Sequence, residues 1–217
     1  MLHLQSFTFN AFLENTYVLY DNSKEAIIFD PGCFDNDEKH TLTSFILDEG
    51  LKVIKLINTH CHIDHVLGNA FVKQQYDVPL LVHKQELPVL KSVSVYASNY
   101  GFPGYEPTLP DGFLEENQII TIGSHELTCL FVPGHSPGHL VFYNEEHKIC
   151  IAGDTLFQDS IGRTDLPGGD HQTLLSHIKK VLFSLPDDTQ VFPGHGGATT
   201  IGYEKTYNPF VGKQARF

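Results

Sequence analysis

Positive charge is scarce in this chain of 217 residues, which has 14 lysines and arginines against 26 aspartates and glutamates. The formal net charge is therefore −12 with histidine counted as neutral. A protein that follows nucleic-acid phosphates needs clustered Lys and Arg side chains, whereas the basic pair Lys179-Lys180 is typical of a solvated helix face. We therefore expect no nucleic-acid partner, and we expect any positive potential at an acidic site to come from bound metal.

Long apolar runs and disulfide-rich patterns are also missing. No apolar run approaches the roughly 20 residues that a membrane-spanning helix needs, so we expect no membrane partner. Residues 1–7 have no basic region and alternate as a strand does, which argues against a signal peptide. The cysteines are few and dispersed, as in a cytoplasmic protein with reduced thiols and unlike a disulfide framework (Cys33, Cys61, Cys129 and Cys150).

Strand and helix patterns are mixed along the chain, and 41% of the residues are hydrophobic, as in an ordinary globular protein. We interpret residues 1–217 as one domain of the α/β class with a layered sandwich architecture. β-Branched, aromatic or alternating runs predict strands over residues 3–9, 16–20, 26–29, 80–82, 118–122, 126–132, 139–143, 148–152 and 190–192. Apolar residues at helical spacing predict helices around residues 42–46, 66–71 and 171–184. The first of these helices has Asp35 or Asn36 as its cap candidate and Gly50 at its end.

Residues 92–117 are the least regular part of the sequence. They combine Gly and Pro with four aromatic side chains close together (Tyr96, Tyr100, Phe102 and Tyr105). Connections of this length are often functional, and a packed surface loop explains the composition equally well. The sequence leaves both interpretations open.

Four potential metal ligands lie within six residues, directly after the apolar stretch 53–58 (His60, His62, Asp64 and His65). Imidazole and carboxylate together suit zinc, manganese or iron. Three buried histidines would need partners for all their ring nitrogens, because each ring carries a donor and an acceptor. A solvated histidine-rich turn is the simpler alternative in a chain with 13 histidines.

Three further candidate ligands occur downstream in equivalent positions. His135, Asp154 and His195 each follow an apolar strand through a glycine. Any one of them alone is more typical of a turn or a helix cap than of a site. The recurrence favours a site, because loops at one edge of a rigid sheet are where binding residues are usually placed.

Together these motifs resemble the metallo-β-lactamase superfamily. The Thr-His-x-His-x-Asp-His motif at 59–65 is followed by Pro-Gly-His at 133–135, Gly-Asp at 153–154 and Gly-His at 194–195, and Asp-Pro-Gly at 30–32 precedes it. The resemblance covers nearly the whole chain and implies the superfamily's αββα four-layer sandwich. It places the metals at one edge, between two central sheets.

The resemblance also implies a division of the seven ligands between two divalent metal ions, most naturally zinc, with iron or manganese as alternatives. A first ion takes His60, His62 and His135, a second takes Asp64, His65 and His195, and Asp154 bridges them. A water or hydroxide completes both coordination shells, so each ion keeps an exchangeable position, as catalytic sites require.

Within the superfamily, residues 162–170, 200–205 and 133–138 are similar to small glyoxalase II-like hydrolases. That family hydrolyses small-molecule thioesters such as S-D-lactoylglutathione. The implied mechanism is attack of a metal-bridging hydroxide on the thioester carbonyl, with Asp64 orienting the nucleophile and Asp154 holding both metals. Cys61, between two ligands, is interpreted as a packing residue that points away from them.

The chain departs from the larger glyoxalase II enzymes in two respects. We expect no counterpart of their C-terminal helical domain, and the chain has Arg163 where their glutathione-binding Gly-Lys-Phe-Tyr-type segment carries a lysine. Thioester chemistry is therefore better supported than glutathione as the carrier. Arg163 is the candidate contact for a substrate carboxylate, since a guanidinium binds a carboxylate through two hydrogen bonds. A structural ion pair with Asp165 or Asp170 is the alternative.

Two other functions fit parts of the pattern. Persulfide dioxygenases of the same fold share the Gly-Arg-Thr-Asp segment at 162–165 and bind one iron, which would fall on His60, His135 and Asp154. Two histidines and one carboxylate suit iron and oxygen chemistry. A metal-binding module without catalysis would be expected to lack a ligand. We expect a hydrolase, because all positions of the second metal are present.

Overall fold

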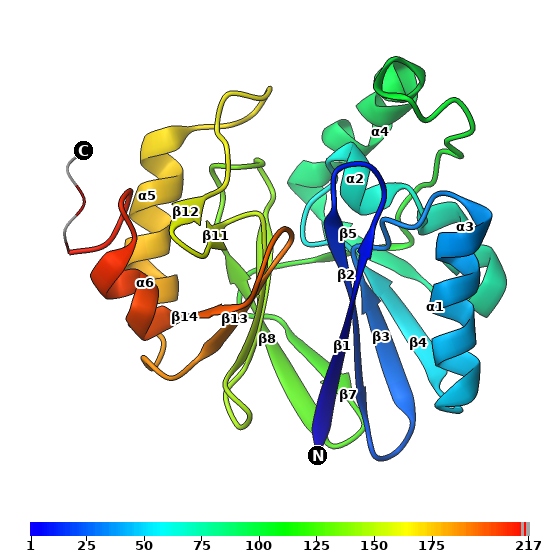
Figure 1. Ribbon diagram of the computed structural model, residues 1–217, viewed down its shortest axis with the longest axis horizontal. Helices are drawn as coiled ribbons and strands as arrows, with labels where there is room; N and C mark the ends of the chain where they lie inside the picture. The colour runs from blue at the N-terminus through cyan, green and yellow to red at the C-terminus, as the bar shows by residue number, and fades with distance from the viewer. Residues whose placement is uncertain (214, 216–217) are drawn as a thin grey trace. The chain divides into compact units, whose positions relative to one another are not determined.

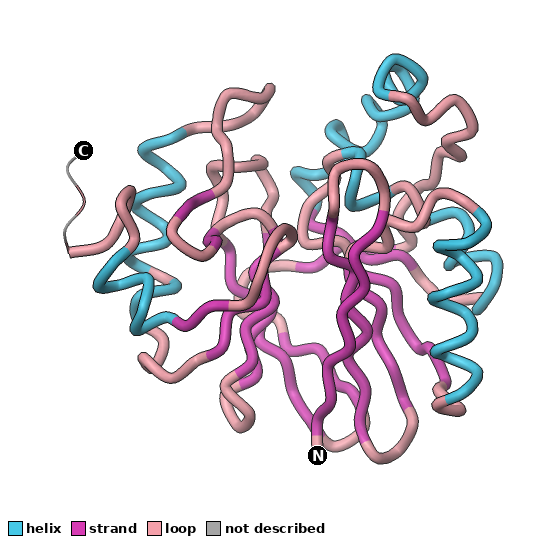
Figure 2. The backbone as a smooth tube through the Cα atoms, viewed as in Figure 1, coloured by secondary structure: helices cyan, strands magenta, loops and turns pink. Residues whose placement is uncertain are grey.

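The computed structural model describes residues 1–213 and 215, which form two compact units. Unit 1 comprises residues 1–114 and 121–125, and unit 2 comprises 115–120 and the chain from 126 onward. Each unit combines β-strands with helices packed against them, which can be followed in Figures 1 and 2. The predicted α/β class is therefore confirmed.

Unit 1 is organised around a six-stranded sheet with the strands in sequence order. The first three strands pair antiparallel, and β3 to β6 pair parallel. The strands are β1 Leu2–Phe9, β2 Glu14–Asp21, β3 Glu25–Phe29, β4 Lys52–Ile57, β5 Leu80–His83 and β6 Gly112–Leu114. The helices are α1 Asn36–Asp48, α2 Ile63–Val66, α3 Asn69–Tyr76 and α4 Leu87–Tyr96, with short 3₁₀ turns η1 Lys84–Glu86 and η2 Ala97–Tyr100.

The core of unit 1 joins the sheet to its helices. Apolar residues of α1, α3 and α4 pack with those of the strands (Leu42, Ile46, Val72, Leu90, Val93, Val18, Ile28, Leu56 and Leu80). Strand residues that alternate with these, such as Leu19, Ile27 and Phe29, are also fully buried. The central strands are therefore rigid, and the loops that follow them start from fixed points.

Unit 2 contains most of a second six-stranded sheet, whose order is β14-β13-β10-β9-β8-β7. These strands are β7 Ile119–Ile122, β8 His125–Phe131, β9 Leu140–Asn144, β10 Ile149–Gly153, β13 Gln190–Pro193 and β14 Thr199–Thr200. A small hairpin of β11 Leu156–Phe157 and β12 Ser160–Ile161 follows β10, and the helices are α5 His171–Lys180, η3 Leu182–Ser184 and α6 Ile201–Tyr207. The core packs α5 and α6 on the strands (Leu174, Ile178, Ile201, Val141, Cys150 and Val191).

The region predicted to be irregular, 92–117, differs in part from that expectation. Helix α4 runs through residue 96, the turn η2 continues to residue 100, and β6 lies at 112–114. The run Ser92–Tyr96 has the alternation of a strand and β-branched residues with low helix propensity. Burial of Leu90 and Val93 against the core overrides that local preference.

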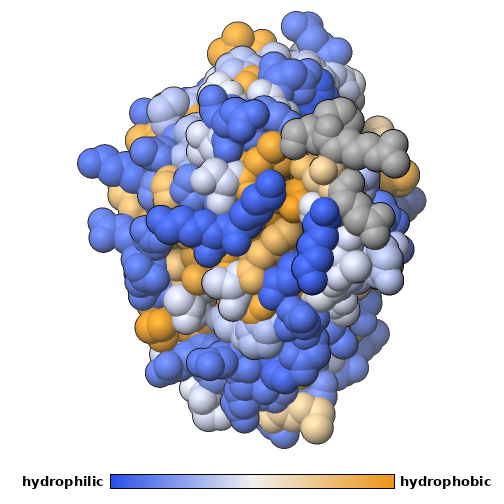
Figure 3. Space-filling model, turned by 90° about the vertical axis from the view of Figure 1, so that its left-hand side faces the viewer, coloured by the Kyte–Doolittle hydropathy of each residue, from blue (hydrophilic) through white to orange (hydrophobic). Residues whose placement is uncertain are grey.

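Figure 3 shows the side of the molecule on which α5 and α6 lie, where hydrophilic residues surround a smaller apolar area. Apolar side chains that pack partly buried on the core of unit 2 include Val181, Phe183 and Phe210. Of the helices in the described part of the chain, none has the length and apolarity needed to cross a bilayer.

Helix α1 begins with a reciprocal cap, which gives a test of the fold. The Asp35 side chain accepts the N–H of Glu38, and the Glu38 side chain accepts the N–H of Asp35. Asp35→Ala should lower the free energy of unfolding by about 1 kcal/mol. Asp35→Ser should lower it less, because a serine hydroxyl also accepts a backbone N–H at this position. Urea unfolding of the three proteins measures this, and identical midpoints would contradict the cap's role.

Candidate metal centre

Within each unit, the candidate ligands, and Asp30 in unit 1, lie at the carboxyl ends of strands that run parallel to one another. In unit 1, Asp30 follows β3 and His60 follows the parallel neighbour β4. In unit 2, Asp154 follows β10 and His195 follows the parallel neighbour β13, while His135 follows β8, two antiparallel steps from β10. Parallel strands end at the same edge of a sheet, so each unit gathers its own ligands at one edge.

Unit 1 brings its four predicted ligands together. The ring centroid of His60 lies 4.8 Å from that of His62 and 4.1 Å from that of His65. A carboxylate oxygen of Asp64 lies 3.6 Å from Nε2 of His65. The rings of His60 and His65 are fully buried, so these side chains form an interior cluster and not a solvated turn.

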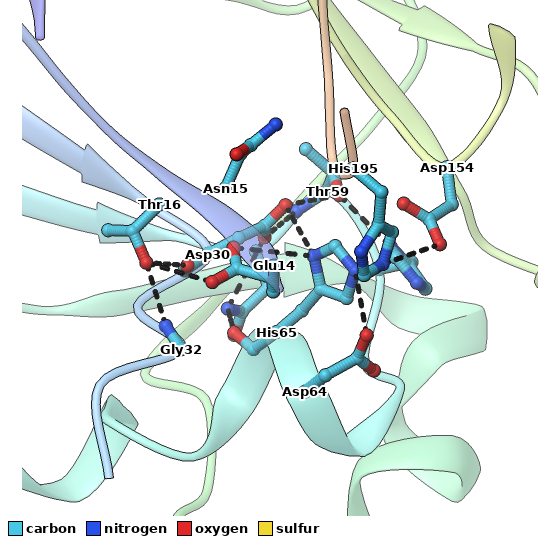
Figure 4. Close-up of polar contacts among 12 residues, drawn as sticks. Glu14, Asn15, Thr16, Asp30, Gly32, Thr59, Asp64, His65, Asp154 and His195 are labelled. Atoms are coloured by element: carbon cyan, nitrogen blue, oxygen red, sulfur yellow. Dashed lines mark hydrogen bonds and ion pairs between the residues drawn. The ribbon is translucent and has the colours of Figure 1, made fainter. Parts of the chain in front are cut away.

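Asp30 fixes the orientation of His65. Its Oδ2 atom lies 3.2 Å from Nδ1 of the His65 ring, and its carboxylate also accepts the N–H of Thr59 at 2.7 Å and the Thr59 hydroxyl at 2.6 Å (Figure 4). With Nδ1 engaged by a carboxylate, Nε2 is the nitrogen directed at Asp64. An outer carboxylate of this kind fixes the tautomer of a metal-binding histidine and raises its basicity.

The backbone of Asp30 adopts an uncommon conformation to make these contacts. Its φ of 48° lies in the left-handed region, which costs a non-glycine residue of order 1–3 kcal/mol. The hydrogen bond from the Asp30 N–H to the Ile57 carbonyl, at 3.0 Å, ties this turn to the end of β4. Asp30 is thus held in place by several contacts at once, which is how such strain persists.

Two buried asparagines hold the backbone on the other side of His65. The Asn58 amide donates to the His65 carbonyl at 3.0 Å, and the Asn69 amide donates to the Asn58 side chain at 2.8 Å. Both asparagines are fully buried. The ring and the main chain of His65 are therefore both fixed by hydrogen bonds.

Glu14, which the sequence analysis did not single out, is fully buried beside the same histidine. Its Oε1 atom lies 3.8 Å from Nδ1 of His65, and its Oε2 atom accepts the Thr16 hydroxyl at 3.0 Å. Burial raises the pKa of Glu14 well above its ordinary value, the charges of Asp30 and Asp64 add to the rise, and His65 opposes it. In the sequence, Glu14 stands two residues before the predicted strand 16–20, with no motif that marks it.

Unit 2 brings its three predicted ligands together around Asp154. The Oδ2 atom of Asp154 lies 3.5 Å from Nε2 of His135 and 3.5 Å from Nε2 of His195. Nδ1 of His135 lies 2.8 Å from the Arg163 carbonyl oxygen, so it carries the proton and Nε2 faces the carboxylate. His195 is the most accessible of the three, with 28% of its side chain exposed.

Gly162 allows the chain to pass close to two of these residues. A Cβ atom at this position would lie 1.9 Å from the Asp154 carbonyl oxygen and 3.0 Å from Nδ1 of His135. No other residue fits without moving the ligand loops. The glycine of the Gly162-Arg163 pair is thus needed for packing, and Arg163 then offers its carbonyl to His135.

His139 is a second residue at the site that was not predicted from the sequence. It is fully buried, and its Nε2 atom accepts the Asp154 N–H at 3.0 Å. The ring therefore supports the turn that presents Asp154. Its place at the start of the predicted strand 139–143 gave no indication of this contact.

Arg163 pairs with Asp165 through two hydrogen bonds, from Nε at 2.8 Å and from Nη2 at 2.7 Å. This hydrogen bonding from Arg163 lowers the pKa of Asp165 to about 2. Asp170, the other predicted partner, caps α5 by accepting the Thr173 N–H at 2.7 Å. The ion pair is exposed, with 62% and 67% of the two side chains accessible, and exposed pairs of this kind contribute little to stability.

Cys61 packs in the hydrophobic core of unit 1, as predicted. Burial raises the pKa of its thiol well above the ordinary value, and the charges of Glu86 and Asp30 add to the rise. A protonated thiol is a poor metal ligand and a poor nucleophile. The cysteine between the two histidines therefore has a packing role.

The donor sets of the two units fit divalent metal ions. Buried imidazoles have Nδ1 engaged by an acceptor and Nε2 directed at a carboxylate, as His65 and His135 do. Imidazole and carboxylate donors suit zinc, iron and manganese. The division of the seven ligands between two ions stays a prediction.

Comparison with known proteins identifies the family. The model of the metallo-beta-lactamase superfamily matches residues 10–195. The chain belongs to this superfamily. The predicted resemblance is thereby confirmed, and with it the superfamily's fold. Membership of this superfamily indicates that the chain is a metallo-hydrolase that binds divalent metal ions.

Relatives within the superfamily include several activities. Hydroxyacylglutathione hydrolase GloC of Haemophilus influenzae is 37% identical over 99% of this chain and 100% of its own length. The crystal structure of BLEG-1 B3 metallo-beta-lactamase has a TM-score of 0.88 at 35% identity, covering 96% of this chain and 99% of its own. The structure of TTHA1623 in a di-iron-bound form has a TM-score of 0.85 at 36% identity, covering 95% and 99%.

Glu14→Gln should change how the stability of the metal-free protein depends on pH. Because the pKa of Glu14 is raised on folding, the folded protein binds more protons than the unfolded chain above the ordinary value of 4.5. The free energy of unfolding of the native sequence should therefore fall, relative to Glu14→Gln, as the pH rises from 4.5 toward the raised pKa. Urea unfolding of both proteins across this range measures the difference, and parallel curves would contradict it.

Proposed function

We propose that this protein is a binuclear metal-dependent hydrolase that cleaves thioesters, as glyoxalase II-like enzymes do. The observation that carries the proposal is the set of seven His and Asp donors, gathered in each unit at the ends of strands, with His65 and His135 oriented by outer hydrogen bonds. Identity of 37% with a hydroxyacylglutathione hydrolase over nearly the whole chain supports the thioester as the substrate class.

The family resemblance supports one arrangement of the ligands. We assign His60, His62 and His135 to one ion, Asp64, His65 and His195 to the other, and Asp154 to both. Zinc is the metal that we propose first, because histidine and carboxylate ligands are its usual ones. Iron is the main alternative, since a relative at 36% identity was crystallised in a di-iron-bound form.

The chemistry divides between the ions and the protein. Bound divalent ions supply Lewis acidity and bring the pKa of a coordinated water to about 7, so that hydroxide is available at neutral pH. Asp30 and the Arg163 carbonyl keep the protons of His65 and His135 on Nδ1, which leaves both Nε2 atoms as lone-pair donors. We assign to Asp64, which has 14% of its side chain exposed, the role of accepting a hydrogen bond from the attacking water and orienting it.

On the substrate side, Arg163 is the residue that we propose for a carboxylate group of the thioester. Its guanidinium already binds the carboxylate of Asp165 through two hydrogen bonds, which is the mode in which a substrate carboxylate would bind. Because that ion pair is exposed and weak, a substrate carboxylate can take the place of Asp165. This contact does not require glutathione as the carrier.

A substrate panel with metal analysis tests the proposed function. We expect turnover of S-D-lactoylglutathione or of another acyl-thioester by protein that holds two metal equivalents. A cephalosporin is the counter-substrate, because a relative at 35% identity is a B3 metallo-β-lactamase. The result that would contradict the hydrolase is one iron per chain, oxygen consumption with glutathione persulfide and no thioester cleavage. That result would indicate a dioxygenase.

Asp154→Ala should abolish both metal retention and activity. Its carboxylate is the one that we assign to both ions, so its loss should lower kcat/KM by at least roughly 100-fold. Asp188→Asn is the matched control, because Asp188 is an exposed aspartate of unit 2 paired with Lys148. Metal content and thioesterase assays of both variants measure the effect, and retained turnover in Asp154→Ala would show the bridging assignment to be wrong.

Arg163→Ala should raise KM for thioesters that carry a carboxylate by about 2–5-fold, because an exposed ionic contact is worth roughly 0.2–1 kcal/mol. The carbonyl oxygen that His135 contacts is retained in this variant, so kcat should change little. Asp165→Asn is the control, since it frees the guanidinium and should not raise KM. Equal KM changes for charged and uncharged thioesters would contradict the role of Arg163.

A further inference from the structure

Glu86 is a fully buried glutamate that the metal assignment does not use. It ends the short turn η1, directly after β5 and before α4. Strand β5 is the parallel neighbour of β4, whose carboxyl end leads to the His60 loop. Because parallel strands end at the same edge of a sheet, Glu86 lies at the edge that carries the histidines of unit 1.

The carboxylate of Glu86 holds the backbone of that loop. Its Oε2 atom accepts the N–H of Cys61 at 2.8 Å, and both residues are fully buried. A hydrogen bond from an amide to a carboxylate is stronger than one to a neutral acceptor, particularly away from water. The main chain is thus fixed at the single residue that separates two candidate ligands.

The position of Cys61 makes this contact matter for both neighbouring histidines. His60 and His62 lie one residue to either side, and their rings meet edge to face at an interplanar angle of 87°. The Cys61 thiol is packed in the hydrophobic core, and its N–H is held by Glu86. A rotation of the peptide before Cys61 would move His60 and His62 relative to each other, and these two contacts prevent it.

We propose that Glu86 is a positioning residue of the metal centre, which sets the geometry of His60 and His62 through the N–H of Cys61. The carboxylate acts as an acceptor for the backbone and is not itself a ligand. The proposal rests on the proposed function in that it takes His60 and His62 as metal ligands. It extends that function by naming a residue on which the affinity for the metal depends.

Three substitutions separate the possible roles of Glu86. Glu86→Gln keeps an oxygen acceptor at the same distance, Glu86→Asp withdraws the carboxylate by one methylene, and Glu86→Ala removes the acceptor. Asp21→Asn is the matched control: Asp21 is a buried carboxylate of unit 1 that accepts the Ser23 N–H at 2.9 Å, in the turn at the opposite ends of β2 and β3 from Asp30.

The experiment is zinc binding to the full chain, measured by competition with a chelator, together with the absorption spectrum of the Co²⁺ form and the Tm of each metal-free variant. We expect Glu86→Asp and Glu86→Ala to bind zinc roughly 10–100-fold more weakly and to change the Co²⁺ spectrum. Glu86→Gln should stay within a few-fold of the native sequence, and Asp21→Asn should change Tm without changing zinc affinity.

Native zinc affinity in Glu86→Asp and Glu86→Ala would overturn the proposal, even with a lowered Tm, because a purely structural carboxylate affects only stability. If Glu86→Ala does not fold, Glu86→Asp alone decides. Native protein that binds zinc but cleaves no thioester would refute the proposed function and leave this proposal standing. Thioester cleavage by native protein, with unchanged zinc affinity in the variants, would refute this proposal alone.

Discussion

The hydrogen bond between the His65 ring and Asp30 is the contact on which the rest of unit 1's ligand cluster depends. It requires Asp30 to leave β3 in a left-handed conformation, and it requires Thr59 to bring its N–H and hydroxyl to the same carboxylate. Asn58 then secures the main chain of His65. A polar cluster can be buried this completely only because the fold holds a hydrogen-bond acceptor beside these buried donors.

The two units satisfy the same requirement with different chemistry. In unit 1 the acceptor for a histidine Nδ1 is a carboxylate, whereas in unit 2 it is the neutral carbonyl of Arg163. A carboxylate acceptor makes the opposite nitrogen a stronger base than a carbonyl does. His65 and His135 are therefore unequal donors, and the ions that we assign to them would differ in acidity even if they were the same element.

The sequence places each predicted ligand after an apolar strand through a short, recognisable motif, as for His135 and Asp154, and their binding of metal stays a prediction. It could not identify Glu14, Glu86 or His139, because their contacts join segments that are far apart in the chain or depend on a buried turn. Helix α4 was missed for a related reason. Its Val and Ser alternation favours a strand locally, and only packing against the core makes it helical.

The parallel half of the first sheet has a consequence for how the protein folds. Antiparallel β1, β2 and β3 are joined by short turns, whereas β3, β4 and β5 pair across long connections that close slowly. Asp30, His60 and Glu86 each follow one of these parallel strands, so they meet only after the slow pairings are complete. In a nascent chain that exposes residues 60–65, Asp30 is already synthesised but not yet paired with the histidine motif, and Glu86 has still to be added. The geometry that orients the histidines is thus completed late in folding, after β3, β4 and β5 have paired.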